Sequence, residues 1–169
     1  VMTMRFSIPA SRYTEPDQMR AFYRAALAEI EALPGVAAAG LVTDLPLAGW
    51  SFGVPFHVAG DPDPGAAARP SAHLQRATPG YAAALGLQLM RGRFLDATDL
   101  AGSRPVCVVN EAFVRKHLGS REPVGARIRA GDSEMEIVGV LKQVKIESPG
   151  ELRDPAEIYV PFEQAPNRN

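Results

Sequence analysis

The sequence predicts an α+β fold that contains a split β-α-β, ferredoxin-like lobe. Two observations lead to this fold class. Residues 4–8 alternate apolar and polar side chains, as half-buried strands do, and a helical pattern and a second predicted strand at 36–45 follow. Residues 71–90 then repeat the order of strand, helix and strand. Two such units in succession are typical of the split β-α-β motif.

The clearest element is the amphipathic helix that follows the first strand. Thr14-Glu-Pro-Asp17 predicts its start, because it resembles a capping box and places proline in the first turn. Pro34-Gly35 predicts its end. Between them, apolar residues recur at spacings of three and four, which indicates one buried helix face. These residues are Met19, Phe22, Tyr23, Ala26, Leu27, Ile30 and Leu33.

The second unit carries its own helix signals. Thr78 is a favourable N-cap, Pro79 suits the first helical position and Gly86 is a natural helix end. Further along, Asn110 is predicted to cap a short helix at 111–118. Strands are predicted at 54–58, 106–109, 126–130, 134–141 and 158–160.

Composition excludes several classes of function. The chain has 169 residues, 46% of them apolar and 22% charged, which suits one domain or two small lobes sharing a core. Its net charge of −1 gives no general attraction to nucleic acid. Neither glycine-rich phosphate-binding pattern occurs, so we expect no ATP site and no cofactor. Cys107 is the only cysteine and lies in an apolar run, where a free thiol is typically a small buried hydrophobe.

The residues with catalytic or metal-binding chemistry form no recognisable site. Gly49-Trp-Ser-Phe-Gly53 matches a hydrolase nucleophile elbow around Ser51, but Val54-Pro55 opposes the helix that must follow the serine. His57, His73 and His117 are scattered, whereas zinc needs three or four converging ligands. We therefore expect neither a catalytic residue nor a metal site, and we expect His117 to interact with the end of its helix.

Two pairs of charged residues also favour a structural interpretation. Arg91-Gly-Arg93 has the composition of an anion site, but Gly92 is better explained by a turn or bulge at the end of a strand. Asp96 and Asp99 are three residues apart, and we expect both in the first turn of a short helix, whose N-terminus stabilises carboxylates.

Trp50 and Phe52 are the candidate contact residues. They lie in a segment rich in proline and glycine, and two interpretations stay open. Their rings either fold back onto the core or form an exposed contact for a partner or an apolar substrate.

A set of short motifs resembles the periplasmic core domain of MacB-type ABC transporter permeases. The set begins with Leu33-Pro-Gly-Val36 and Asp44-Leu-Pro-Leu47, and it continues through Thr78-Pro-Gly-Tyr81 and Arg91-Gly-Arg-Phe94 with Asp99. The motifs follow the order of the family over almost the whole chain. The remaining ones are Leu85-Gly-Leu87, Leu89, Val108-Val-Asn-Glu-Ala-Phe113, Pro123-Val-Gly125, Ile137-Val-Gly-Val140 and Ile158-Tyr-Val-Pro161. The acidic stretch after Arg-Gly-Arg-Phe is similar to the duplicated orphan permeases of acidobacteria.

The resemblance implies a fold of two lobes on the periplasmic side of the inner membrane. A porter-like lobe would comprise residues 1–48 and 71–94, a loop or hairpin residues 49–70, and a mixed sabre-like lobe residues 95–163. Membrane helices would flank the domain in the native chain, and both chain ends would then emerge on one face. Partners would be a second permease copy, a cytoplasmic ATP-binding subunit or domain and, in some members, a periplasmic adaptor protein.

The function implied is a non-catalytic one. The domain would relay the movement that ATP hydrolysis produces in the membrane helices and contact substrate or partner proteins during export. A soluble periplasmic ligand-binding or sensory module is the alternative, and it requires an apolar pocket with convergent polar groups. A small hydrolase using Ser51 is a third hypothesis, for which we expect no activity.

Overall fold

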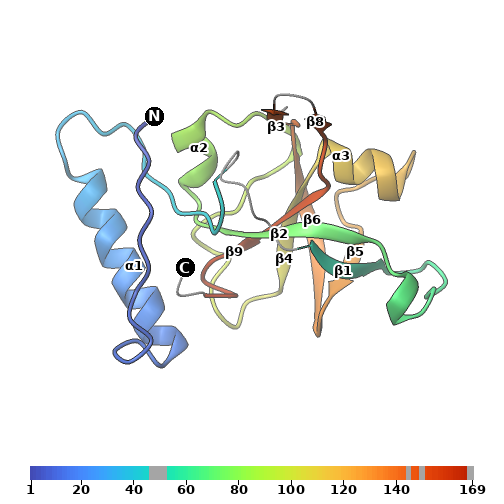
Figure 1. The fold of residues 1–169 in the computed structure, drawn as a ribbon, viewed down its shortest axis with the longest axis horizontal. Helices are drawn as coiled ribbons and strands as arrows, with labels where there is room; N and C mark the ends of the chain where they lie inside the picture. The colour runs from blue at the N-terminus through green and yellow to red at the C-terminus, as the bar shows by residue number, and fades with distance from the viewer. Residues whose placement is uncertain (46–52, 144–145, 149–150, 167–169) are drawn as a thin grey trace.

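The computed structural model describes residues 1–45, 53–143, 146–148 and 151–166, and Figure 1 shows its fold. The helices are α1 Pro16–Glu31, the 3₁₀ turn η1 Ala66–Ala68, α2 Tyr81–Leu85, α3 Glu111–Phe113 and the π-helical turn η2 Val114–Leu118. The strands of the main sheet are β1 Gly53–Val58, β2 Ser71–Ala77, β3 Leu89–Gly92, β4 Val106–Asn110, β5 Arg127–Ala130, β6 Ser133–Leu141 and β9 Glu157–Pro161. Strands β7 Ile146–Ser148 and β8 Glu151–Arg153 form a separate hairpin.

Six of the strands close into a barrel. Around it the order is β6, β4, β9, β2, β1 and β5, and β5 pairs again with β6. Closure is achieved because β6 is nine residues long. Its first half pairs with β5, its second half pairs with β3, and its other edge pairs with β4. A closed barrel leaves its strands without free edges, so only β3 extends the sheet outward.

Two glycines allow β3 and β6 to lie in close contact. A Cβ atom on Gly139 would lie 1.9 Å from the carbonyl oxygen of Arg93, and one on Gly92 would lie 2.1 Å from that of Val138. Gly92 also has a φ of +66°, which side chains disfavour. The predicted role of Gly92 in a turn or bulge is therefore confirmed.

The sheet of the barrel is packed by one cluster inside it and one outside it, and a third cluster lies on α1. On β4, Cys107 and Val109 point inward and Val106 and Val108 point outward, and all four are buried. The outer pair is covered by Tyr81 of α2 and by its neighbours in the second cluster. The inner cluster includes Phe56, Val58, Ala72, Ile128, Met135, Ile137, Ile158 and Val160. Strand β4 is thus central, with both faces packed.

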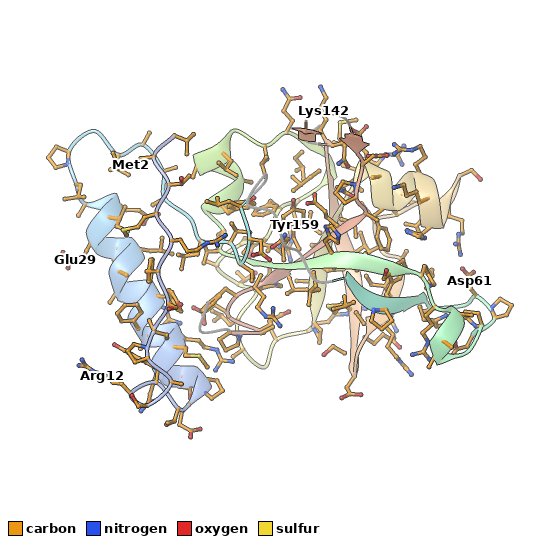
Figure 2. The ribbon with its side chains drawn as sticks, in the orientation of Figure 1. Met2, Arg12, Glu29, Asp61, Lys142 and Tyr159 are labelled. Atoms are coloured by element: carbon orange, nitrogen blue, oxygen red, sulfur yellow. The ribbon has the colours of Figure 1, made fainter. Side chains whose placement is uncertain are left out.

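Residues 1–45 form an N-terminal layer beside the barrel, with α1 as its helix (Figure 1). The capping box of α1 is built around Glu15 rather than Thr14, one residue later than predicted. The side-chain oxygen of Gln18 accepts hydrogen bonds from the backbone N–H groups of Thr14 and Glu15, at 3.0 and 3.2 Å. Side chains such as Arg12 and Glu29 project from this layer, whereas Tyr159 lies in the centre of the molecule (Figure 2).

An aromatic cluster joins the N-terminal layer to the end of β9. The ring of Tyr23 on α1 lies 5.7 Å from the ring of Phe6 and 4.9 Å from the ring of Phe162. Nearby, the Arg20 guanidinium donates to the backbone oxygen of Glu163 at 2.7 Å, and Arg24 pairs with its carboxylate at 2.9 Å. The segment around Phe6 and the segment after β9 therefore pack against the same face of α1.

The structure differs from the predicted ferredoxin-like lobe in its strands. Residues 4–8 are extended but pair with no strand in the described part of the chain, and residues 36–45 contribute one isolated bridge, between Val42 and Ala77. The strands predicted at 71–77 and 87–90 exist, but they belong to the sheet of the barrel and are separated there by β9, β4 and β6. The fold is mixed α and β around one main sheet, and the lobe boundaries stay a prediction.

Asn110 connects three elements through a buried amide. Its side-chain oxygen accepts from the backbone N–H groups of Phe113 and Glu157, at 2.9 and 3.1 Å. Its side-chain nitrogen donates to the Pro155 carbonyl at 2.8 Å and to the Glu157 carboxylate at 3.0 Å. The predicted helix cap is confirmed, and the same amide also fixes the start of β9 against the end of β4.

We predict that Asn110→Ala destabilises the fold by about 3 kcal/mol, because it removes a helix cap and leaves buried polar groups unpaired. Urea unfolding of both proteins measures the difference. Asn110→Asp is the matched variant. Its carboxylate can accept the same two hydrogen bonds but cannot donate the other two. At acidic pH the protonated carboxyl can donate one of them, so the loss of stability should be smaller there. An alanine variant as stable as the wild type would contradict this account of the amide.

Glu157 is a largely buried carboxyl beside Asn110 and Tyr159. Burial raises the pKa of Glu157, and the hydrogen bonds from Tyr159 and Asn110 lower it only in part. A carboxyl whose pKa is raised in the folded state binds its proton more tightly when folded than when unfolded. Its stabilising contribution is therefore complete below the ordinary value of 4.5 and is lost as the pH rises through the folded pKa.

We predict that Glu157→Gln removes this dependence, since glutamine retains an acceptor for Tyr159 and Asn110 but never ionises. The free energy of unfolding of the wild type, relative to the variant, should fall as the pH rises above 4.5. Glu29→Gln is the control, because it removes a carboxyl at an exposed position on α1 and leaves Glu157 in place. The prediction fails if the two substitutions behave alike.

Candidate functional site

The three histidines do not form a metal site with other described residues. His57 lies on β1, His73 on β2 and His117 on η2, and the described residues include no group of three ligands able to hold a metal ion. His117 packs against the rings of Phe56 and Phe113, at 4.8 and 5.2 Å. Burial lowers the pKa of His117. His117 lies in the last turn of η2 and packs there against two core rings, and its predicted interaction with the helix end stays a prediction.

Ser51 and Cys107 are the two candidate nucleophiles. Ser51, Trp50 and Phe52 lie outside the described residues, but strand β1 begins at Gly53. A nucleophile elbow needs a helix at that point, so the local geometry opposes a hydrolase. Cys107 is fully buried, and burial raises the pKa of its thiol, which keeps it protonated.

The Arg-Gly-Arg segment is occupied by ion pairs. The Arg93 guanidinium forms two bonds of 2.7 Å with the carboxylate of Asp99, which is only 4% exposed. Asp99 also accepts from the backbone N–H of Asp96 at 2.9 Å, so it closes the turn that both acids share. Arg91 pairs with Glu122 at 2.9 Å. We call the Arg93–Asp99 ion pair a staple, because it joins the end of β3 to the following loop. Residues 96–99 form a turn and no helix, so the expectation that a helix N-terminus holds the two acids was wrong.

The Thr78-Pro-Gly-Tyr81 motif anchors the N-terminal layer to the barrel. Thr78 and Leu41 exchange two hydrogen bonds: the Leu41 N–H donates to the Thr78 hydroxyl at 2.8 Å, and the Thr78 N–H donates to the Leu41 carbonyl at 3.1 Å. A Cβ atom on Gly80 would lie 2.0 Å from the carbonyl oxygen of Ala39. The motif therefore needs both a hydroxyl and a residue without a side chain.

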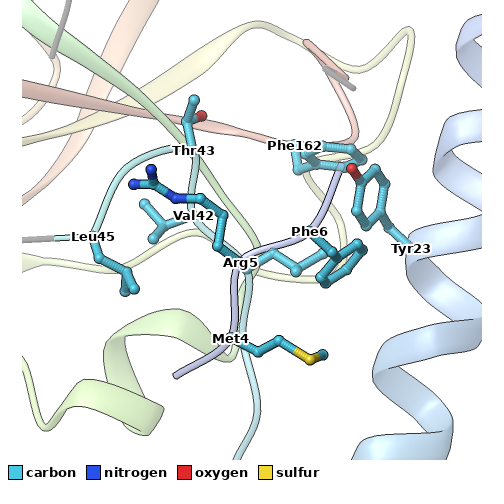
Figure 3. A pocket seen from close by; sticks show the side chains of 9 residues that line it. Met4, Arg5, Phe6, Tyr23, Val42, Thr43, Leu45 and Phe162 are labelled. Carbon is cyan, nitrogen blue, oxygen red and sulfur yellow. The ribbon is translucent and has the colours of Figure 1, made fainter. Parts of the chain in front are cut away.

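A groove lies between the N-terminal layer and the barrel. It is open to solvent along Met4, which is 72% exposed. Figure 3 shows its lining side chains. Apolar groups predominate, and Arg5, Thr43 and Tyr23 supply the polar ones. The lining residues are Met4, Arg5, Phe6, Tyr23, Leu41, Val42, Thr43, Leu45 and Phe162.

These observations define a structural domain whose sequence motifs serve packing and anchoring. Comparison with known proteins identifies its family. The chain matches the MacB-like periplasmic core domain over residues 3–169 and belongs to that family. No curated protein matches the sequence.

Two solved structures have a similar fold. The periplasmic region of MacB from Actinobacillus actinomycetemcomitans aligns with a TM-score of 0.59 and 18% sequence identity, covering 83% of this chain and 55% of that one. The extracellular domain of YknZ, a noncanonic ABC-type transporter from Gram-positive bacteria, aligns with a TM-score of 0.55 and 19% identity, covering 82% and 61%. At this identity the likeness shows the fold alone, and this chain spans little more than half the length of either relative.

Sequence analysis recognised these motifs but did not find what they do. Arg93 and Asp99 were considered separately, as an anion site and as a helix start, because no local pattern in the sequence pairs them. The groove had no sequence signal, because it depends on where residues 4–6 and 41–45 come to lie.

We predict that Gly80→Ala destabilises the fold by about 2 kcal/mol, because the added methyl group collides with the Ala39 carbonyl oxygen. Pro79→Ala is the control at the neighbouring exposed position, where we expect a change within about 0.5 kcal/mol. Thermal and urea unfolding measure both. Equal stability of the two variants would show that the anchor tolerates a side chain at Gly80.

Proposed function

We propose that this chain is the extracytoplasmic domain of an ABC transporter permease and that it performs no chemistry itself. In this proposal it relays movement driven by ATP hydrolysis from the membrane helices to a substrate or partner protein. Membership of the MacB-like periplasmic core domain family is the observation that carries the proposal. The closed barrel supports it, because a relay needs a body that moves as one unit.

The contacts of α1 support the same role. Phe6 and Phe162 contact the same ring, that of Tyr23, so the N-terminal segment and the segment after β9 lie against one face of α1. A displacement applied there would pass through α1 and the Glu163 ion pairs into the barrel. The N-terminal layer would belong to a porter-like lobe and residues 95–163 to a sabre-like lobe.

The proposed setting is the periplasmic side of the inner membrane. None of the described helices combines the length and the apolar character needed to cross a bilayer. In this proposal the domain is part of an integral membrane protein. Its partners would be a second permease copy, a cytoplasmic ATP-binding subunit or domain and, as in some family members, a periplasmic adaptor protein.

We predict that the domain moves as a unit during the ATPase cycle of the complete permease. Spin labels at D132C, in the turn between β5 and β6, report the distance between the two copies, and a pair at E29C and D132C reports the distance within one copy. Both positions are exposed. Pulsed electron spin resonance should show that the first distance changes between the nucleotide-free and ATP-bound states, while the second stays constant.

An ATP-binding subunit that cannot bind nucleotide is the control and should abolish the change. A distance between copies that ignores ATP would refute the relay. A change within one copy alone would instead indicate that the N-terminal layer moves against the barrel.

A further inference from the structure

Residues 154–157 lead into β9 and are tied to β4 by a single side chain; we call these residues the strap. The Asn110 side chain binds the strap at two backbone groups. Its nitrogen donates to the Pro155 carbonyl at 2.8 Å, and its oxygen accepts from the Glu157 N–H at 3.1 Å. One amide on β4 therefore sets the position of the strap.

Two other elements hold the strap as well. The His73 N–H of β2 donates to the Ala156 carbonyl at 2.8 Å. On η2, Arg115 pairs with the Asp154 carboxylate and Lys116 donates to the Asp154 carbonyl. The side chains of Arg115 and Asp154 are 58% and 40% exposed, and ion pairs this exposed contribute about 0–1 kcal/mol. The end of the strap at η2 is therefore held weakly.

The other end of the strap carries the carboxyl of Glu157, which pairs with no cation in the described part of the chain. Its Oε2 accepts from the Tyr159 hydroxyl at 2.9 Å and from the Asn110 amide at 3.0 Å. Tyr81 of α2 is also near, since burial and then the charge of Glu157 raise the pKa of Tyr81. His73 occupies the facing register position on β2. While His73 is neutral, an ionised Glu157 is a buried charge beside neutral groups only.

Ionisation of Glu157 therefore favours detachment of the strap. Burial raises the pKa of Glu157 while the strap is closed. In a detached strap the carboxyl is in water, and its pKa returns towards 4.5. The closed form consequently binds the proton more tightly. Its advantage is complete below pH 4.5 and is lost as the pH rises through the pKa of the closed form.

The barrel can stay paired while the strap detaches. Strand β9 pairs with β2 at five register positions, from His73–Glu157 to Ala77–Pro161, and only the first position involves the strap. The pairing of β9 with β4 begins after the strap, at Ile158. Detachment therefore costs one position of the ladder and is a local opening rather than global unfolding.

We propose that the strap is a proton-controlled latch, closed while Glu157 carries its proton and shifted towards an open form when the carboxyl ionises, with the barrel folded in both forms. Opening would release Arg115 and Lys116 from Asp154 and leave two free cations on η2. The latch goes beyond the relay proposed above and does not rest on it, because it is a property of the folded domain alone.

Amide hydrogen exchange of the 169-residue chain tests the latch. The amides of His73 and Glu157 report on the strap, and those of Val108 and Val109 report on the barrel. Protection is measured relative to an unstructured peptide at the same pH. We expect the protection of the strap amides to fall about 10-fold for each pH unit above 4.5, until Glu157 is ionised in the closed form.

Low concentrations of urea separate local from global opening. They should speed exchange in the barrel and leave exchange in the strap unchanged, because a local opening exposes little surface. Strap amides that share the protection and the urea dependence of the barrel amides would overturn the proposal. Strap protection that is independent of pH would also overturn it.

Two substitutions test the role of Glu157 from opposite directions. Glu157→Gln should make the protection of the strap independent of pH, while Glu29→Gln, at an exposed position on α1, should leave the fall in place. Tyr159→Phe removes a hydrogen bond that lowers the pKa of Glu157, so the fall should continue to a higher pH before it levels off. A fall that persists in Glu157→Gln would overturn the proposal, and so would a fall that levels off at the wild-type pH in Tyr159→Phe.

Discussion

The pairing of β6 with three neighbours is the constraint on which the rest of the structure depends. Its first half pairs with β5 and closes the barrel, and its second half pairs with β3. In that second half, Gly139 lets the backbone of Arg93 come close to β6. The Arg93 and Asp99 staple can only form because this close contact fixes where β3 ends. The inner core, the α2 cover and the anchor at Thr78 are all built on the sheet that β6 closes.

The elements that were well predicted from the sequence are those whose signals are local. Pro34-Gly35 and the apolar spacing predicted the bounds of α1 within a few residues. Asn110 predicted the end of β4 and the start of α3. The barrel strands were also placed within about two residues, because alternation and turn glycines act over short distances. The order of those strands in the sheet has no such signal. Strand β2 pairs with β9, more than eighty residues away, and local patterns do not encode that contact.

The missed features have a common physical cause. The extended segments at 4–8 and 36–45 have the side-chain pattern of strands but lack the neighbours that would make them strands, and pairing is a property of two segments. The same holds for the site residues: whether Arg91 and Arg93 bind an external anion depends on whether Glu122 and Asp99 already occupy them. In this domain the charged residues of the Arg-Gly-Arg motif form ion pairs within the protein.

The buried position of Cys107 has a practical consequence. It is the only cysteine among the 169 residues, its side chain has no exposure to solvent, and its thiol stays protonated. Maleimides and other thiol reagents react with accessible thiolates, so the native domain presents them with no target. A cysteine placed anywhere on its surface would therefore be the single reactive position of the domain, and site-specific labelling needs no prior removal of a native thiol from the barrel.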